Sequence, residues 1–435
     1  MTKQVLKFTT LLLMLFVCVG KLSVAQEIFA TLVGTVTDPS GAVIPNAMVT
    51  VHNNESGIDV RAVTTDGSGN FTVTNLAAGN YTIIVKSPGF STYTAKNVTL
   101  NVAQKRPLEV QLQPGQVTEN ITVSETATPV QTTSAAQAET VTGTQIRELQ
   151  LNNRNFEQLV TLQPGVVSGL PDVVNFGISN TSTVVVNGAR SSANNWTVDG
   201  ADVNDSGSNT TLLNVPSVDA IQEFTLQRST YDAQYGRSGG GQVLVATKSG
   251  TNAFHGDVYE FVRNDAFNAN DFFANSVGSP RAPERYNNYG FTLGGPLYVP
   301  RFYKRSDSKT FFFWSEEWRK TSQPSTDVAT VPTAQELAGS FPSVQLNPAG
   351  APAGCIANSP AGGQINPSCF SQNAKAYLAN VYSKFPANAD NGNQYITNVV
   401  SLNNYRQDLV RLDQNVGNKI HLFSRFIQDV VPCPQ

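Results

Sequence analysis

The sequence predicts a mainly β chain with an N-terminal β-sandwich, a mixed α+β region and further strands towards the C-terminus. Three observations predict this order. Alternating apolar and polar segments recur between turn signals over residues 28–113. A helical pattern near residue 156 then precedes several strand-like segments. Charged residues make up only 14% of the chain, against about 25% in ordinary soluble proteins, and Ser, Thr, Asn and Gly take their place, as in secreted β proteins.

Residues 1–25 are predicted to be a secretory signal peptide. Lys3 and Lys7 precede an apolar run over residues 11–19, and small residues at 23–25 suit signal peptidase. The apolar run is shorter than the roughly 20 residues that a membrane-spanning helix needs. We therefore expect export, with cleavage after Ala25.

Residues 26–113 alternate like the strands of a small β-sandwich. Turn sequences such as "DPSG" and "TDGSGN" separate the segments, and no helical period interrupts them. This spacing predicts two packed antiparallel sheets. The expected strands are 32–38, 47–53, 71–76, 81–87 and 108–114.

Three stretches of this region, "GTVTDPSGAVIPNAMVTV", "TTDGSGNFTVTNLAAGNYTI" and "SPGF", resemble a carboxypeptidase regulatory-like domain. The resemblance implies an accessory module without an active site. His52 and Glu55 match an H-x-x-E zinc pair, but a zinc site needs a third protein ligand. The next histidine, His255, lies far along the chain, so we expect His52 only to end a strand.

Residues 114–143 are rich in Thr, Ser, Ala, Gln and Glu, which predicts a flexible linker. Beyond them Phe156, Leu159, Val160 and Gln163 fall on one face of a helix that ends at Pro164-Gly165. Strand-like segments follow at 182–190, 194–200, 220–227 and 242–248.

The order of the later segments carries a second resemblance. The stretches "LNNRNFEQLVTLQPGV", "VNGARSSANNWTVDGADVN" and "VDAIQEFTLQRSTYDAQYGRSGGGQVLVATKSGTN" resemble the plug domain of TonB-dependent outer-membrane receptors. More narrowly, a regulatory-like sandwich ahead of a plug is similar to the Oar-like group. The resemblance implies a plug over residues 144–250 and the N-terminal part of an outer-membrane β-barrel over 251–435.

Five barrel strands can be placed in the last segment by their alternation: 255–264, 289–297, 309–318, 408–416 and 419–428. The 22 strands of such transporters need roughly 220 residues at about 10 each. Since residues 250–435 cannot supply them, we expect the sequence to be a fragment of a longer receptor. The aromatic run Phe311 to Trp314, with Trp318, fits a girdle at the membrane interface, and the alternative is a buried strand of a soluble sandwich.

A glycine cluster, Gly239 to Gly241, precedes the strand-like segment at 242–248. No Lys-Ser or Lys-Thr pair follows at the distance that a phosphate loop requires. Gly236 to Gly240 match G-x-S-x-G around Ser238, but that hydrolase elbow needs a helix directly after it. We therefore expect structural glycines that let two backbones approach closely.

The remaining features exclude several classes of function. A net charge of −3 offers no basic surface for nucleic acid. The three histidines form no metal-binding spacing. Asp199, Asp202 and Asp205 lie three residues apart, unlike an EF-hand, which leaves a polar loop or another calcium loop. We predict no catalytic, cofactor or metal residues, and no enzyme.

The resemblance implies import of a scarce ligand (a siderophore, oligosaccharide, peptide or cobalamin) by a receptor in the Gram-negative outer membrane and its lipid. The sandwich and plug would lie on the periplasmic side or within the barrel. A TonB-type periplasmic energy-coupling protein would pull on an extended segment by strand addition. Ile121, Thr122, Val123 and Ser124 form a β-prone island in the right place, and a plain linker strand is the alternative. The alternative function is an adhesion or surface-assembly protein with the sandwich as its binding arm.

Cys355 and Cys369 lie in a stretch rich in Pro, Gly and Asn. In an oxidising compartment this pattern predicts a disulfide-closed irregular loop, extracellular between two barrel strands. The alternative is that both thiols stay free. Cys433 has no predicted partner.

Overall fold

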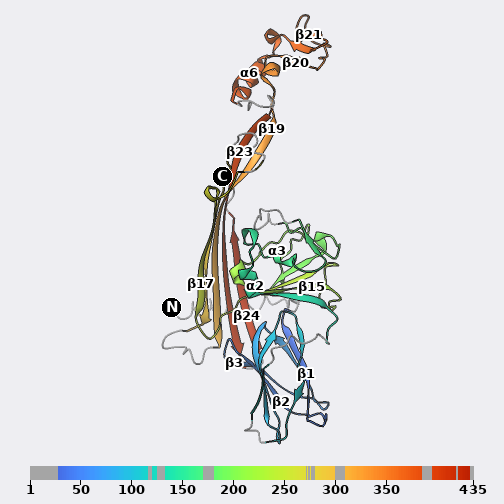
Figure 1. Ribbon diagram of the computed structural model, residues 1–435, viewed down its shortest axis with the longest axis vertical. Coiled ribbons are helices and arrows are strands. Elements are labelled where there is room, and N and C mark those ends of the chain that lie inside the picture. The colour runs from blue at the N-terminus through green and yellow to red at the C-terminus, as the bar shows by residue number, and fades with distance from the viewer. Residues whose placement is uncertain are drawn as a thin grey trace, which may run out of the picture. The chain divides into compact units, whose positions relative to one another are not determined.

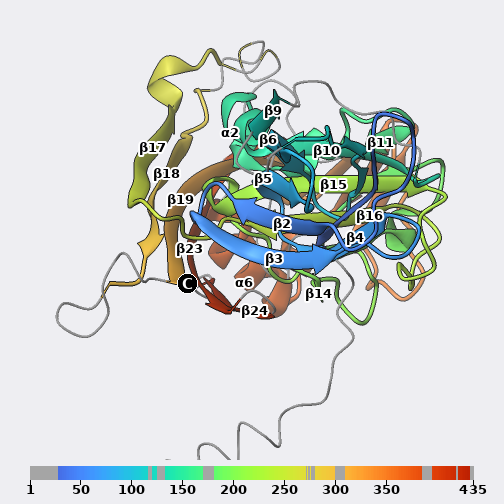
Figure 2. The same cartoon turned by 90° about the horizontal axis from the view of Figure 1, so that it is seen from below.

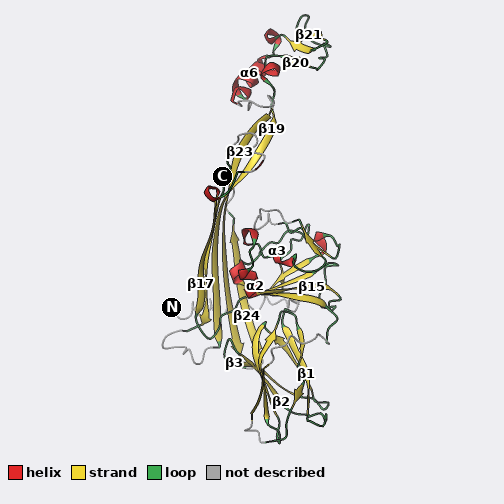
Figure 3. Ribbon diagram, viewed as in Figure 1, coloured by secondary structure: helices red, strands yellow, loops and turns green. Residues whose placement is uncertain are grey.

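The computed structural model describes residues 28–115, 120–124, 133–169, 181–270, 272, 275, 280–298, 309–384, 394–417 and 420–431. The predicted cleavage site after Ala25 and the cysteine at 433 lie outside these residues. The chain divides into two compact units. The first comprises residues 1–259, 290–317 and 405–431, and the second residues 260–289, 318–404 and 432–435. Strands dominate the described chain, and its helices are short (Figure 3).

The N-terminal domain is the predicted sandwich, shown in blue in Figure 1. One sheet runs in the order β3 (Ile58–Thr64), β2 (Met48–Asn53), β5 (Gly79–Lys86), β6 (Thr92–Leu100) and β9 (Asn120–Ser124). Figure 2 shows β3, β2 and β5 side by side. The other sheet has β1 (Ala30–Thr37) between β4 (Asn70–Leu76) and β7 (Lys105–Pro107), with β8 (Val110–Gln111) also on β1.

The core of the sandwich follows from the alternation in the sequence. Every second residue of the central strands is buried, for example Val49 and Val51 on β2 and Ile83 and Val85 on β5. The expectation of purely antiparallel sheets is wrong in one respect. β1 pairs in parallel with β7 and β8, and β6 pairs in parallel with β9. Each of these partners arrives through a connection rather than a tight hairpin, so its direction need not reverse.

The middle domain has a five-stranded sheet in the order β10 (Gln137–Thr142), β15 (Ile221–Ser229), β16 (Gln242–Thr247), β13 (Asn195–Val198) and β14 (Ala201–Asp202). β10 and β9 both lie within residues 114–143, where the composition predicts a flexible linker. The ordered sheet therefore begins before the predicted domain boundary at residue 144.

Short helices cover this sheet. α2 (Gly143–Glu148) begins at a capping box formed by Thr142 and Gln145, and α3 (Glu157–Val160) follows the 3₁₀ turn η1 (Asn152–Arg154). All four residues of the predicted helical face are buried: Phe156, Leu159, Val160 and Gln163. The two-stranded sheet of β11 (Val166–Ser168) and β12 (Val184–Val186), with the 3₁₀ turns η3 (Ser191–Ala193) and η4 (Val218–Ala220), completes the domain.

A third sheet runs in the order β17 (His255–Asn264), β18 (Arg285–Pro296), β19 (Thr310–Thr330), β23 (Gln394–Val416) and β24 (Ile420–Val430). In β23 and β24 of this sheet, polar side chains are buried and apolar side chains are exposed, which is the reverse of a sheet in a soluble protein. Along β23 the buried face carries Gln407, Arg411 and Asp413, whereas Val410 and Leu412 are 38% and 45% exposed. β24 likewise exposes Leu422, Phe426 and Val430. Polar residues inside and apolar residues outside are the pattern of a membrane β-barrel.

The aromatic run of β19 is split between the two faces. Phe311 and Phe313 are 2% and 0% exposed, while Trp314 is 39% exposed and packs edge-on against Phe291 of β18 at 4.8 Å between ring centroids. The outward residues of the run, Phe312 and Trp314, therefore fit a girdle at the membrane interface. Phe311 and Phe313 pack inside.

Within the second unit, residues 334–384 form a small lobe. It contains α5 (Ala334–Leu337), a sheet in the order β20 (Ser340–Pro342), β22 (Gly362–Ile365) and β21 (Ile356–Ser359), and α6 (Gln372–Asn380). A disulfide joins Cys355 to Cys369, whose Cα atoms are 5.7 Å apart. The stretch between the two cysteines, predicted as an irregular loop, thus contains the paired strands β21 and β22 and ends in a 3₁₀ turn. Among the described residues, no helix is both long and apolar enough to cross a membrane.

The glycine cluster before β16 is structural at two of its three positions. A Cβ on Gly240 would lie 2.8 Å from the Ala193 carbonyl oxygen, and one on Gly241 would lie 2.9 Å from Val186 and Leu226. Gly239 has nothing within 4 Å, so the prediction of close packing is wrong there. After Ser238 and the three glycines the chain enters strand β16 at Gln242 rather than a helix, which contradicts a nucleophile elbow.

We expect Gly240→Ala to destabilise the middle domain by about 1–3 kcal/mol, the usual cost of an added methyl in a packed site. The neighbouring Asn194 cannot move away easily, because its amide donates to Val184 and accepts from Gly241. The urea concentration at which the domain becomes protease-sensitive measures the effect. Gly239→Ala is the matched control and should leave that concentration unchanged; equal shifts in both variants would contradict the packing argument.

Candidate functional site

The candidate site begins at a tight turn in the middle domain. Val198 pairs with Ala201, so Asp199 and Gly200 alone connect β13 to β14. Both have positive φ angles, 48° and 81°, as a two-residue type I′ hairpin turn requires. The Asp-Gly pair is a favoured sequence for this turn, and here it also aims a carboxylate away from its own hairpin.

The Asp199 side chain is only 1% exposed and accepts four hydrogen bonds. Thr247, at the end of β16, donates its amide at 2.9 Å and its hydroxyl at 2.7 Å. Arg411 of β23 donates at 3.2 Å, and Arg425 of β24 donates at 2.8 Å. One carboxylate therefore joins the middle domain to two strands of the third sheet.

The two arginines explain why a carboxylate is needed at this point. Arg411 and Arg425 are directly opposite each other in the antiparallel register of β23 and β24, where like charges repel. Asp199 lies between them and neutralises one charge. Asp413 neutralises the other, because its carboxylate accepts from the Arg411 Nε and Nη2 atoms at 3.0 and 2.9 Å. The Asp199 cluster, defined as Asp199, Thr247, Arg411, Asp413 and Arg425, is thus charge-balanced.

A second contact joins the same two parts of the first unit. Arg154 pairs with Asp219 within the middle domain and lies over the ring of Tyr259 on β17, 4.9 Å from its centroid. Tyr259 donates to Glu317 of β19 at 3.1 Å. Burial raises the pKa of Asp219, while the nearby Arg154 charge acts in the opposite direction. This contact depends on Asn153 and Arg154, which both adopt left-handed φ angles of 54° and 53°.

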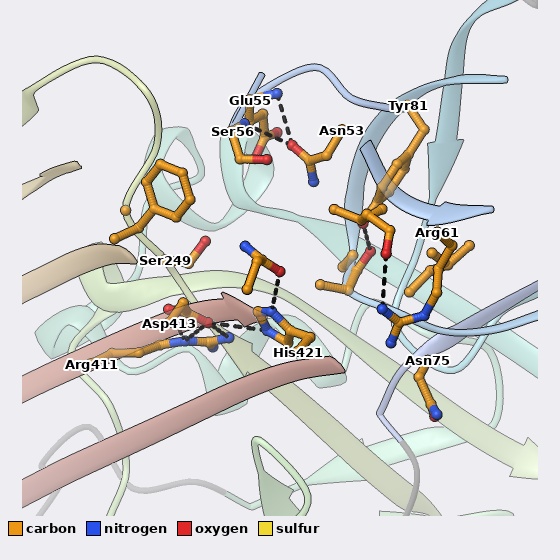
Figure 4. A pocket seen from close by; sticks show the side chains of 17 residues that line it. Asn53, Glu55, Ser56, Arg61, Asn75, Tyr81, Ser249, Arg411, Asp413 and His421 are labelled. Carbon is orange, nitrogen blue, oxygen red and sulfur yellow. Dashed lines mark hydrogen bonds and ion pairs between the residues drawn. The ribbon is translucent and has the colours of Figure 1, made fainter. Parts of the chain in front are cut away.

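A cavity of about 60 Å³ lies beside the Asp199 cluster. Arg411, Asp413 and His421 line one side and Glu55, Arg61 and other sandwich residues line the opposite side (Figure 4). Ligand pockets usually have about 300–1,000 Å³, so this space suits a few water molecules rather than a substrate.

Three family models match the chain in the order of its domains. A carboxypeptidase regulatory-like domain matches residues 31–113, a TonB-dependent receptor plug domain matches 129–243, and an outer membrane β-barrel domain matches 246–433. The chain belongs to the TonB-dependent outer-membrane receptors. The sandwich ahead of the plug is similar to the Oar-like group, and the middle domain and third sheet are its plug and its barrel wall.

A curated relative, the TonB-dependent transporter Oar of Myxococcus xanthus, is 25% identical over 292 residues, which is 64% of this chain and 26% of the relative. The chain thus spans about a quarter of that relative's length. Among solved structures, the outer membrane transporter YddB from Escherichia coli matches with 12% identity and a TM-score of 0.38, covering 65% of this chain and 31% of that chain. Catechol 1,2-dioxygenase from Pseudomonas arvilla C-1 matches 21% of this chain and 54% of its own, with 12% identity and a TM-score of 0.18.

Glu223 of β15 also meets the sandwich. Its carboxylate accepts from the Val102 amide at 2.5 Å, and Thr225 donates to the Val102 carbonyl oxygen at 3.3 Å. Burial raises the pKa of Glu223 to about 7. The receptor therefore has a carboxyl group at this domain contact that changes its protonation near neutral pH.

The aspartates of the calcium interpretation are engaged separately. Asp199 binds the wall arginines, and Asp202 forms an ion pair with Arg237. Asp205 accepts from backbone amides of its own loop, including Thr211 at 2.8 Å, and these hydrogen bonds lower its pKa to about 2. Because the three carboxylates have different partners, they do not converge on one ion.

The other sequence-predicted positions are also accounted for. His52 lies in β2, and its ring is 2.8 Å from the Asp59 carboxylate on the adjacent strand. In the described part of the chain, no three His, Cys, Asp or Glu side chains gather into a possible metal site. Ile121 to Ser124 lie in strand β9 on the sandwich, and Cys355 and Cys369 lie in the lobe of the second unit.

Sequence reasoning missed the Asp199 cluster. It noted Asp199 only as part of a polar loop or a calcium loop, and gave Arg411 and Arg425 no role. A signal was nevertheless present, since these arginines occupy inward positions of strands whose outward positions are apolar. An isolated charge on the inner face of a barrel strand needs a partner inside the barrel.

Proposed function

We propose that this receptor imports a scarce ligand across the outer membrane, with the Asp199 cluster as the latch that keeps the plug in the barrel. The observation that carries the proposal is the Asp199 carboxylate shared by two wall arginines. A plug held only by apolar contacts would not depend on one residue. A plug held by a few buried ion pairs can be released when a pulling force breaks them together.

The energy for this release would come from a TonB-type periplasmic protein. Strand addition to an extended segment gives such a partner main-chain hydrogen bonds to pull on. We propose residues 121–124 as that segment, because they form a β-strand and precede the plug sheet in the sequence. The curated relative is named a TonB-dependent transporter, which supports the same mechanism. The ligand class we propose is a siderophore, an oligosaccharide or a peptide.

An uptake experiment tests this function. Cells that express the receptor are given isotopically labelled ferric siderophore, oligosaccharide and short peptide in separate assays. We expect one of these probes to accumulate, and a protonophore to stop its accumulation. Ile121→Pro, which removes a main-chain donor, should reduce accumulation at least tenfold but leave binding at the cell surface intact.

The conservative variant Ile121→Val is the matched control and should transport normally. Accumulation that continues in Ile121→Pro would remove residues 121–124 from the mechanism. Surface binding with no energy-dependent accumulation of any probe would contradict transport and favour the adhesion protein.

A further inference from the structure

The proposed coupling segment is held in a sheet. β9 pairs in parallel with β6 over five residue pairs, from Thr92 opposite Asn120 to Lys96 opposite Ser124. The next residue of β6, Asn97, adopts a left-handed φ of 60°, and β6 bulges against β5 at this point. β9 is the last strand in the order of this sheet.

β9 belongs to neither of the domains that it connects. The regulatory-like domain match ends at residue 113 and the plug match begins at residue 129. The residues that match the regulatory-like domain therefore do not include β9, which lies at the edge of the sandwich sheet. This extra strand is the connection between the two domains, folded back onto the sandwich.

The backbone of β9 is already engaged on one side. Strand addition to a partner uses the same amide and carbonyl groups that a sheet neighbour uses. Force applied to the segment must also separate β9 from β6, because the sandwich lies before it in the chain and the plug lies after it. A short, parallel edge pairing is weaker than a central antiparallel one, which makes an exchange of partners feasible.

From this arrangement, and resting on the proposed function, we infer that the sandwich stores the energy-coupling segment as strand β9. The periplasmic coupling protein takes the segment over by strand exchange, using an open edge of its own sheet. The sandwich thus limits access of the coupling protein to the receptor, and release of β9 from β6 precedes energised transport.

A reversible covalent lock tests the inference. Thr94 and Thr122 occupy the same register position on β6 and β9, so Thr94→Cys/Thr122→Cys should form a disulfide in the oxidising periplasm. The probe is the purified periplasmic domain of the TonB-type protein, and the readout is its affinity for the receptor in detergent. We expect at least tenfold weaker binding to the oxidised double variant, with full recovery after reduction.

Two controls separate the lock from other effects. Each single cysteine variant should bind like the unmodified receptor. Asn80→Cys/Thr99→Cys occupies a register position between β5 and β6 and locks the sandwich without touching β9, so its affinity should not depend on oxidation.

The possible outcomes are distinct. Equal affinity of the oxidised and reduced Thr94→Cys/Thr122→Cys receptor would overturn storage by the sandwich and leave the transport proposal intact. Failure of the disulfide to form, checked by mass spectrometry, would overturn the β6–β9 pairing. An unmodified receptor that does not bind the periplasmic domain would overturn the energised function as well.

Discussion

Replacing Asp199 by asparagine is expected to loosen the plug, lowering its free energy of unfolding by about 3–5 kcal/mol, the cost of breaking a buried ion pair by removing one partner. Asparagine has the same shape and tolerates the left-handed φ of 48°, so the hairpin should survive. The change leaves Arg411 and Arg425 opposite each other with only Asp413 to neutralise them. The urea concentration at which the plug becomes protease-sensitive in outer-membrane vesicles measures the loss.

The same hairpin offers a matched control. Asp202 pairs with Arg237, and their side chains are 33% and 47% exposed, so Asp202→Asn should cost less than about 1 kcal/mol. Adding Arg425→Gln to Asp199→Asn removes one of the two facing charges and should recover more than half of the lost stability. If Asp199→Asn behaves like Asp202→Asn, the cluster does not hold the plug.

Removal of the disulfide by Cys355→Ala/Cys369→Ala is expected to destabilise the lobe of the second unit by about 3 kcal/mol. The bridge lowers the chain entropy of the unfolded state by an amount that corresponds to this free energy for a loop of this length, and its removal gives that entropy back. The two residues are 14 positions apart. We propose that the lobe is extracellular, since β19 and β23 have 21 and 23 residues, about twice the length that a membrane strand needs. Faster proteolysis of residues 334–384 on intact cells would measure the effect.

The alanine pair avoids leaving a single reactive thiol, and Ser368→Ala, next to Cys369, is the control for a change at the same surface. Mass spectrometry of non-reduced peptides from outer membranes should show the linked Cys355–Cys369 pair. Alkylation of both thiols without prior reduction would refute the bridge.

Most of the fold could be predicted from the sequence because strands and turns depend on local pattern. The segment 255–264 was predicted as a strand and is β17, and the segment 71–76 lies within β4. Alternation decides which side chains of such a strand share a face, and turn residues such as Asp-Gly decide where it reverses. The order of the domains could also be predicted from the sequence, because each family resemblance rests on contiguous motifs.

The pairing of distant segments could not be predicted in this way. The local sequence predicts a β-prone segment at β9, but it does not indicate that this segment pairs in parallel with β6 rather than staying extended in a linker. β10 is similar, since its composition predicts a linker and its order comes from pairing with β15 along the sequence Gln137 to Thr142. An edge strand needs only a neighbour with free backbone groups, and the neighbour is a property of the fold.

The sequence by itself determined that the chain is a mainly β outer-membrane receptor with a sandwich, a plug and barrel strands, because period, turn chemistry and motif order are properties of neighbouring residues. Only the tertiary structure decided that the Asp199 carboxylate lies between Arg411 and Arg425 of the third sheet. Its arginine partners lie 212 and 226 positions away in the sequence, and a buried charge acquires its partner from the packing of whole sheets, over which the local sequence has no control.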